Sequence, residues 1–291
     1  MFELVKLTEN CFYINSPAKI GLYTLGDEAV LIDSGNDKDA GRKIRQLLDK
    51  NGLKLRAVYN THSHADHIGG NRYLQQNTGC RVFAPGIECC FANHPILEPV
   101  SLYGGYPHPE LRHKFLLAQE CDAEPLSDSV LPDGFSSIPL PGHFFDMVGY
   151  RTPDDVVFIA DCLSGAETIE KYKITFLYDV GAYLDTLEKV KTMEARLFLP
   201  SHAEPTEDIR PLAELNIKNT LSVAELILDI CREPSGFDCI LKRIFETLGM
   251  VMTPQQHALI GSTVRSYLAW LMEKGEVSAE IDGNVMVWKR I

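Results

Sequence analysis

Ten consecutive residues, Thr61-His62-Ser63-His64-Ala65-Asp66-His67-Ile68-Gly69-Gly70, carry the strongest structural signal in this chain. They place three imidazoles and one carboxylate within six positions. Neutral imidazoles and carboxylates are ligands of Zn, Fe and Mn. The run therefore predicts a metal site, and its length and composition make a false match improbable.

The residues on either side predict that this run is a loop between a strand and a helix. Arg56 to Asn60 is a short apolar segment that indicates a buried strand, and Asn71 to Asn77 indicates a helix that ends near Gly79. In a locally extended loop, the first two histidines can direct both imidazoles to one ion. The Asp-His pair that follows then turns toward a second ion.

Three further candidate ligands lie downstream, each after an apolar, strand-like segment. They are His143 after Phe135 to Leu140, Asp161 after Val156 to Ala160, and His202 after Leu197 to Ser201. A single His or Asp in this setting is more often an ordinary turn residue. Three in the same setting, together with the histidine-rich run, favour a second set of ligands.

In the order HxHxDH, His, Asp, His, the chain resembles the metallo-β-lactamase-fold hydrolases over residues 2–205. The resemblance implies an α/β fold, the four-layer αββα sandwich of that family. The ligands it implies are His62, His64 and His143 for one metal, Asp66, His67 and His202 for the other, and Asp161 as the bridge. An apolar strand ending in Asp33-Ser34-Gly35 is similar to the family's early turn, whose acidic side chain supports the ligand loop.

The implied cofactors are two divalent metal ions, Zn as the first choice and Fe or Mn as alternatives. Two ions about 3.5 to 4 Å apart can share one hydroxide, lower its pKa toward about 7 and polarise a substrate oxygen. Asp66 can accept a hydrogen bond from the hydroxide and later take its proton, which makes it the candidate catalytic residue. The prediction is a dinuclear hydrolase that uses a metal-bridging hydroxide on a small ester, thioester or lactone.

Other branches of the family fit this chain less well. Secreted β-lactamases usually have Cys where this chain has Asp161, and flavodiiron oxidoreductases have Glu in place of His64. Thioesterases similar to glyoxalase II match the ligands, but no cationic groups for a thiol carrier can be located in the C-terminal helices. RNA-processing members are usually more basic, so a nuclease or phosphodiesterase ranks as an alternative.

Two more distant alternatives also remain. One is a mononuclear iron oxidoreductase of the persulfide dioxygenase type, centred on His62, His143 and Asp161. The other is not an enzyme but a metal-binding regulator that acts through a winged helix. A complete set of seven ligands argues against the regulator, because a scaffold needs no open dinuclear site.

Two aromatic side chains are candidate substrate contacts. Phe144 follows the ligand His143 and, with Phe145, makes this mouth of the site bulkier than in many relatives. Tyr183 opens a helical pattern after Asp161. Ordinary core packing explains both aromatics equally well.

Residues 87–129 form an irregular stretch that looks like an insertion, rich in Pro, His, Tyr and acidic residues. Long irregular segments are often functional, so this one is a candidate lid over the metals, although plain surface structure ranks slightly ahead. The side chains that would form the lid are His94, Tyr103, Tyr106, His108 and His113.

The predicted domains are a metal-binding hydrolase domain over residues 1–205, a linker over 206–215 and a small domain over 216–291. The predicted helices of the small domain span 216–232, 237–248 and 254–274, the last with Thr253 as N-cap and Pro254 at its first position. Alternation on both sides of Asp282-Gly283-Asn284 predicts a hairpin. Three helices and a hairpin resemble the winged-helix domain of some of these hydrolases.

Composition constrains the partners. From residue 216 onward, eight Lys and Arg stand against nine Asp and Glu, and the whole chain has a net charge of −12, so a small-molecule substrate is favoured over nucleic acid. The eight Cys lack CxxC spacing and are expected to be free thiols; Cys162, beside Asp161, is expected to pack behind the site. No long apolar segment or secretion signal is recognisable, which favours a cytoplasmic protein without a membrane partner. Homo-oligomerisation stays open.

Overall fold

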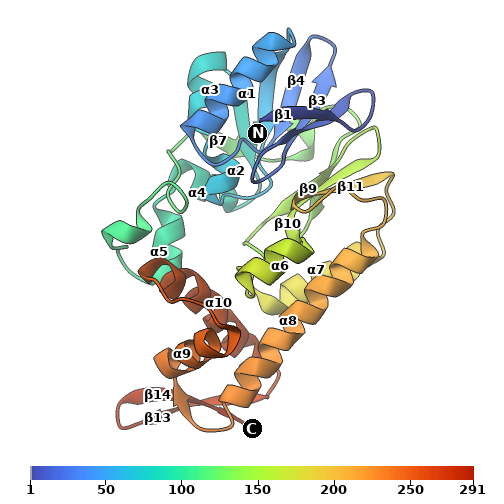
Figure 1. Ribbon diagram of the computed structural model, residues 1–291. Helices are drawn as coiled ribbons and strands as arrows, with labels where there is room; N and C mark the ends of the chain where they lie inside the picture. The colour runs from blue at the N-terminus through green and yellow to red at the C-terminus, as the bar shows by residue number, and fades with distance from the viewer. Residues whose placement is uncertain (1) are drawn as a thin grey trace.

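The computed structural model describes residues 2–291, so Met1 of the predicted first domain lies outside the described residues (Figure 1). Seven strands form the first sheet in the order of the sequence. They are β1 (Glu3–Lys6), β2 (Cys11–Asn15), β3 (Ile20–Leu25), β4 (Glu28–Ile32), β5 (Lys54–Tyr59), β6 (Arg81–Ala84) and β7 (Ala123–Pro125). Strands β1 to β4 pair antiparallel, and β4 to β7 pair parallel through helical connections.

Four strands form the second sheet, in the spatial order β11-β10-β9-β8. They are β8 (Ser136–Pro139), β9 (Val148–Arg151), β10 (Val156–Ser164) and β11 (Leu197–His202). Helices α6 (Ala166–Tyr172) and α7 (Val180–Lys191) connect the parallel pair β10 and β11. The carboxyl ends of β10 and β11 therefore lie side by side.

The two sheets pack face to face with helices on both outer faces (Figure 1). Between the sheets, Tyr59 and Phe83 of the first meet Tyr150 and Phe158 of the second in one apolar cluster. On the outer face of the first sheet lie α1 (Lys38–Lys50) and α3 (Asn71–Thr78), and on that of the second lie α7 and α8 (Arg210–Ile230). The predicted four-layer αββα architecture is confirmed.

The elements that follow α8 are two helices and a small sheet. They are α9 (Phe237–Leu248), α10 (Pro254–Glu273) and the strands β12 (Ser235–Gly236), β13 (Val277–Asp282) and β14 (Val285–Arg290). The Thr253 hydroxyl accepts a hydrogen bond from the backbone amide of Gln256 at 3.1 Å, which confirms the predicted N-cap. The hairpin is also confirmed, and Gly283 and Asn284 make its two-residue turn with positive φ.

Helix α8 begins at Arg210 rather than at residue 216, so it takes up part of the predicted linker 206–215. It packs on α7 and β10 along one part of its length and on α9 and α10 along another, while α10 also contacts α5 (Leu97–Tyr103). The long α8 and the approach of α10 to α5 are visible in Figure 1. The order of helices and strands is consistent with a winged helix, and that assignment stays a prediction.

The predicted insertion is only partly irregular. It contains α4 (Glu88–Asn93), α5, β7 and short 3-10 turns at Pro109–Leu111 and Asp128–Val130. Of the side chains proposed for a lid, Tyr103 packs on His108 with ring centroids 5.3 Å apart, and Tyr106 is largely exposed. The contacts of this region with the ligand loop come instead from buried glutamates, described below.

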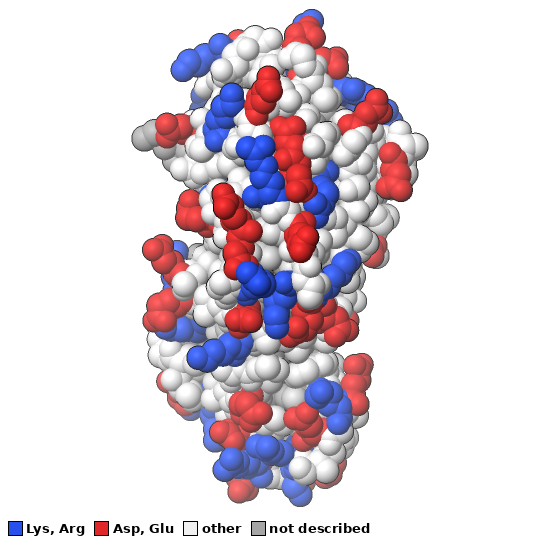
Figure 2. Space-filling model, turned by 90° about the vertical axis from the view of Figure 1, so that its right-hand side faces the viewer, with Lys and Arg blue, Asp and Glu red and all other residues white. Residues whose placement is uncertain are grey.

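On the face shown in Figure 2, acidic and basic side chains are intermixed over the height of the molecule.

None of the helices within residues 2–291 has both the length and the apolar character needed to cross a bilayer.

Candidate metal centre

The ligand loop begins where β5 ends and continues into the single-turn helix α2 (Ala65–Ile68). Its two glycines allow close packing against the turn after β4. A Cβ on Gly69 would lie 2.3 Å from the backbone of Asn36, and one on Gly70 would lie 2.3 Å from the carbonyl oxygen of Ser34. These contacts leave no room for a side chain, so the loop is held in place by its backbone.

Three histidines form the first ligand group. Nε2 of His62 and Nε2 of His143 each lie 3.1 Å from Nδ1 of His64. Nitrogens that share a tetrahedral zinc ion, with bonds of about 2.0 to 2.1 Å, are separated by about 3.3 Å. The observed spacing therefore fits a metal bound at the centre of the three rings.

The second group contains Asp66, His67, Asp161 and His202. Oδ1 of Asp161 lies 3.2 Å from Nε2 of His67, and its Oδ2 lies 3.1 Å from Nε2 of His202. Oδ2 of Asp66 lies 3.4 Å from the same nitrogen of His202. Oδ2 of Asp161 also lies 3.8 Å from Nε2 of His143, so this carboxylate adjoins both groups.

Two buried atoms of the second group support a metal in this position. Nε2 of His67 and Oδ1 of Asp161 lie 3.2 Å apart, yet neither makes a well-oriented hydrogen bond among the residues that the structure describes. Leaving buried polar atoms unpaired is costly, and a cation between them would satisfy both. The nitrogen and oxygen donors fit Zn, Fe or Mn.

The second nitrogen of several ligands is held by a neighbour, which orients the first toward the metal. Nδ1 of His67 contacts Oδ2 of Asp33 at 2.8 Å, Nδ1 of His62 contacts the Thr61 hydroxyl at 3.0 Å, and Nδ1 of His202 contacts the Pro17 carbonyl at 3.2 Å. Asp33 also accepts hydrogen bonds from the amide and hydroxyl of Thr61. Asp33 thus supports the ligand loop, as the sequence implied.

The sequence predicted that Asp161 follows the end of its strand. In the structure Asp161 lies inside β10, which continues to Ser164. The pairing of β10 with β11 shifts register on both sides of Ala160, whose φ is +50°. Such irregularities bend a strand and redirect its side chains. The bulge brings Asp161 to the ligand groups although the strand continues to Ser164.

The pKa values of the first group favour neutral, metal-binding imidazoles. Burial, together with His67 and His64, holds the pKa of His62 well below its usual range. Burial and the neighbouring His143 lower the pKa of His64 to about 3, and burial lowers that of His143. These rings therefore need not release protons to bind a cation near neutral pH.

The second group is ion-paired in the metal-free protein. Burial opposes a charge on His67 and His202, but Asp161 and its neighbours outweigh it, holding the pKa of His67 well above its usual range and raising that of His202 to about 10. Burial opposes ionisation of Asp161, yet the two histidines hold its pKa well below the usual range. Metal binding here displaces protons from the imidazoles.

Two buried glutamates of the insertion brace the ligand loop, and sequence reasoning missed both. Glu88 accepts hydrogen bonds from the amide and hydroxyl of Ser63 and from the amide of Asp146, so it ties the loops of His62 and His143 together. Burial raises its pKa to about 7. Glu98 is buried with Oε1 4.0 Å from Nε2 of His64. No local pattern marks either residue, because both lie in ordinary helical sequence.

The two predicted aromatic contacts have different settings. Phe144 is buried with its ring centroid 4.3 Å from that of His64 and lines a cavity with Phe176 and Trp270, so it lies at the site. Tyr183 is buried in the core behind the His143 loop, and its hydroxyl donates to Asn216 at 3.3 Å. Tyr183 therefore packs the scaffold and presents no open surface to a substrate.

All eight cysteines are free thiols, as expected. Cys162 is fully buried in the core beside α7 and α8. Burial, and secondarily Asp161, raises the pKa of its thiol far above the usual range. Cys162 therefore packs behind the site as a small apolar residue.

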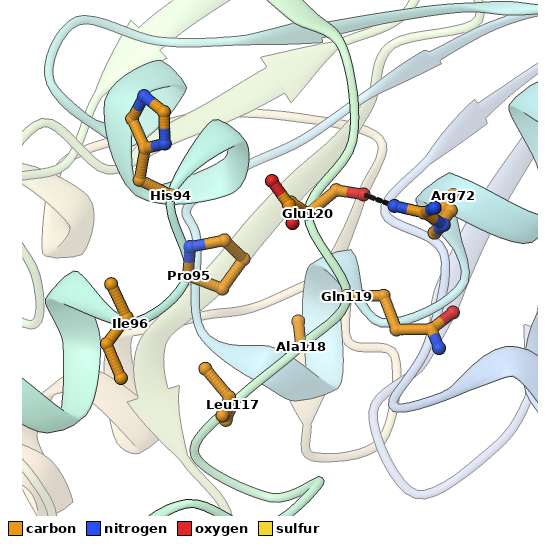
Figure 3. Close-up of a pocket in the computed structure, with 8 residues that line it drawn as sticks. All are labelled: Arg72, His94, Pro95, Ile96, Leu117, Ala118, Gln119 and Glu120. Atoms are coloured by element: carbon orange, nitrogen blue, oxygen red, sulfur yellow. Dashed lines mark hydrogen bonds between the residues drawn. The ribbon is translucent and has the colours of Figure 1, made fainter. Parts of the chain in front are cut away.

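The cavities differ in their relation to the ligands. A cavity of about 440 Å³ between α3, the start of α5 and residues 117–120 is lined by none of the seven ligand residues. Figure 3 shows it, with the guanidinium of Arg72 donating to the carbonyl oxygen of Glu120 at 3.1 Å. A larger cleft of about 720 Å³ is lined by His202 and therefore adjoins the candidate centre.

Comparison with known proteins places these residues in a family. A family model described as the metallo-beta-lactamase superfamily matches residues 15–202. The hydroxyacylglutathione hydrolase of Methylobacillus flagellatus is 41% identical over 69 residues, which is 23% of this chain and 26% of that protein. Hydroxyacylglutathione hydrolase 1 of Vibrio vulnificus is 27% identical over 57% of this chain and 54% of that protein. The probable metallo-hydrolase YybB of Bacillus subtilis is 24% identical over 66% of this chain and 86% of that protein.

Similarity to solved structures extends over the whole chain. A metallo-beta-lactamase family protein of Thermus thermophilus superposes with a TM-score of 0.73 at 17% identity, covering 99% of this chain and 97% of that one. A beta-lactamase domain protein of Burkholderia ambifaria gives 0.71 at 17% identity, covering 99% and 94%. At this identity the likeness shows the fold. The match to the first of the hydroxyacylglutathione hydrolases spans about a quarter of that relative's length.

Proposed function

Because this chain belongs to the metallo-beta-lactamase superfamily, we propose that it is a hydrolase with a dinuclear metal centre. The observation that carries the proposal is the position of Asp161. Its two oxygens lie within 3.2 Å of His67 and His202, and one of them lies 3.8 Å from His143 of the first group. A carboxylate in contact with both groups can bridge two ions and set their separation.

Bound divalent ions would supply a nucleophile from water at neutral pH and would polarise the substrate oxygen. The side chains of this chain have separate tasks. His62, His64 and His143 would hold one ion, and the second group would hold the other, with Asp33 orienting His67. Asp66 has a side chain that is 36% exposed and a pKa held below the usual range, against the effect of burial, by His67 and His202. As an open, ionised carboxylate, it can accept a hydrogen bond from the attacking group and take its proton.

The protein side chains nearest the ligands are not free to act as nucleophiles. The Ser63 hydroxyl is buried and donates to Glu88, and Cys162 is buried in the core. Covalent catalysis requires an activated and accessible hydroxyl or thiol. Attack by water is therefore the route that the arrangement favours.

The substrate class that we propose is a small ester, thioester or lactone, with a thioester as the first choice. Several relatives are named hydroxyacylglutathione hydrolase, and a hydroxyacyl glutathione is a thioester. The cleft of about 720 Å³ beside His202 is within the range that small-molecule sites occupy.

The first experiment is metal analysis by plasma mass spectrometry on protein purified without added metal or chelator, followed by assays on thioesters, lactones and phosphodiesters. We expect about two metals per chain and thioester hydrolysis that is lost on chelation and restored by metal. His202→Ala should lower occupancy and activity, whereas His94→Ala, a change at an exposed histidine, should not. One iron per chain with oxygen consumption would overturn the dinuclear proposal in favour of the persulfide dioxygenase type.

A further inference from the structure

The cleft beside His202 is formed by segments that are distant in sequence. The turn between β2 and β3, the start of α6 and the connection from β11 to α8 surround it. Pro17, Lys19, Gly165, Thr168, His202 and Glu204 are among its lining residues. Because His202 is also a candidate ligand, a molecule in this cleft would lie next to the metal centre.

Lys19 is the only Lys or Arg that lines this cleft within residues 2–291. Its side chain is 9% exposed, which is unusual for lysine. Its amide donates to the Ser201 carbonyl oxygen at 3.0 Å, so the backbone of Lys19 is attached to β11 next to His202. The backbone of Lys19 is therefore held beside His202, and its ammonium group can reach the cleft that His202 also lines.

The carboxylate partner of Lys19 is easily replaced. Nζ of Lys19 lies 3.2 Å from Oε1 of Glu204, whose side chain is 85% exposed. Ion pairs with a solvated partner contribute little, about 0 to 1 kcal/mol, so Glu204 can exchange for another anion with little loss. An ammonium group on a side chain with so little solvent contact, by contrast, favours an anionic or polar partner.

Apart from the candidate metal ligand, the other charged residues that line the cleft are acidic, so Lys19 is the side chain there that can bind an anion. Asp208 is neutralised by Arg210, with two contacts of 2.8 Å, and Glu167 is exposed. The lining also includes the apolar residues Pro205, Pro211 and Leu212. The cleft thus offers one enclosed cation and an apolar surface beside the metal ligands.

We propose that Lys19 binds an anionic group of the substrate, a carboxylate or a phosphate, after Glu204 moves aside. The enzyme then selects acyl substrates that carry a negative charge a short distance from the bond that is hydrolysed. This inference rests on the proposed hydrolase function and specifies its substrate class. Since the chain has a net charge of −12, an anion that approaches without such a site is repelled.

The test compares Lys19→Met with the wild type on two thioesters of equal acyl length, one ending in a carboxylate and one in the corresponding methyl ester. The measured quantity is the ratio of kcat/KM for the anionic thioester to kcat/KM for the neutral one. Loss of a charged hydrogen bond predicts that this ratio falls about 10- to 100-fold, mainly through KM for the anionic substrate. Lys54→Met is the matched control, because Lys54 pairs with Asp27 at 3.1 Å on the exposed surface.

Glu204→Gln provides a second variant, and its exposed position makes misfolding improbable. It frees Lys19, so KM for the anionic thioester should decrease. An unchanged selectivity ratio in both variants would overturn the proposal, and a lower melting temperature of Lys19→Met alone would then assign the pair a purely structural role.

A binding measurement separates this proposal from the hydrolase proposal. Succinate and inorganic phosphate are titrated calorimetrically into wild-type protein, Lys19→Met and Lys54→Met, all metal-loaded. Binding that is lost only in Lys19→Met supports the anion site even if no thioester is hydrolysed, and the tighter ligand identifies carboxylate or phosphate as the preferred group. Equal binding to all three proteins would contradict it.

Discussion

Asp161 connects the two ligand groups, and its replacement tests the dinuclear assignment at the scale of one residue. Asp161→Ala removes the carboxylate that contacts His67, His202 and, at 3.8 Å, His143. We expect the metal content to fall from about two per chain to one or fewer, and hydrolysis to be lost, while the circular dichroism spectrum is retained. Asp185→Ala, at an exposed position of α7, is the control. Normal turnover by Asp161→Ala would contradict the bridging role.

Glu88 makes the stability of the metal-free protein depend on pH. Burial raises its pKa from 4.5 to about 7 in the folded state, so the folded protein retains a proton that the unfolded chain loses above about pH 4.5. The contribution of Glu88 to the free energy of unfolding is therefore zero below about pH 4.5. It becomes increasingly unfavourable as the pH rises toward about 7. Above that it stays constant, at a destabilisation of about 3 kcal/mol.

Urea unfolding of the metal-free wild type and of Glu88→Gln between pH 5 and pH 8 measures this effect. The free energy of unfolding should fall more steeply with rising pH in the wild type than in Glu88→Gln. Glu225→Gln, at an exposed position of α8, should retain the wild-type slope. Parallel slopes in all three proteins would show that Glu88 is ionised throughout.

Residue identity was enough to name seven candidate ligands, which the structure brings together in two groups, whereas the side chains that support them were not predictable. The seven ligands stand out because several His and Asp follow apolar segments. Glu88, Glu98 and Lys19 have no such signature. Their burial depends on loops that meet only in the folded chain.

At the scale of elements, the loop between β8 and β9 depends on one glycine. Gly142 has a φ of +118°, and a Cβ there would lie 2.2 Å from the amide nitrogen of Tyr183 in α7. Gly142→Ala should lower the free energy of unfolding by about 3 kcal/mol or more, because both the backbone and the packing are incompatible with a side chain. It should also weaken metal binding by displacing His143.

Gly52→Ala is the matched control for this loop. Gly52 also has a positive φ, +67°, but nothing lies within 4 Å of its Cβ position. Its replacement should cost only the strain of the left-handed conformation, about 1 to 2 kcal/mol. Urea denaturation measures the free energy of unfolding of both variants. If Gly142→Ala and Gly52→Ala lose the same amount, the close contact with Tyr183 does not contribute to the cost of Gly142→Ala.

The elements themselves were predicted best where their pattern is periodic or their caps are polar. Thr253 and the Gly283-Asn284 turn mark α10 and the hairpin clearly. The start of α8 lacks a polar cap, because its N-cap residue, Ile209, makes no side-chain hydrogen bond and is buried in the core, and the one start signal there, Pro211 in the first turn, was missed. The bulge that places Asp161 within β10 likewise leaves no trace in the apolar segment around it.

At the scale of the whole molecule, one apolar cluster joins the second sheet to the C-terminal elements. It includes Val157 and Leu187 of the sandwich together with Ile244, Leu268 and Trp288 beyond α8. A continuous core favours cooperative unfolding. The C-terminal elements should therefore not melt separately from the sandwich.

The two tryptophans make this testable, because Trp270 and Trp288 both lie in the C-terminal elements. Tryptophan fluorescence reports on those elements, and far-UV circular dichroism reports on the entire chain. We expect the two urea transitions to have the same midpoint and the same slope. A fluorescence transition at lower urea concentration would show that the C-terminal part is an independent unit.

The amino-acid sequence by itself determined the types and order of the candidate ligands, the strand-to-helix setting of the histidine run and the C-terminal helices and hairpin. These follow from side-chain chemistry and short-range periodicity, which any segment carries within itself. Only the tertiary structure decided that Asp161 contacts both ligand groups, that Tyr183 is packed in the core, that Glu88 braces two loops and that Lys19 is enclosed beside His202. Distance and burial between residues remote in the chain arise from packing, and a local pattern holds no information about them.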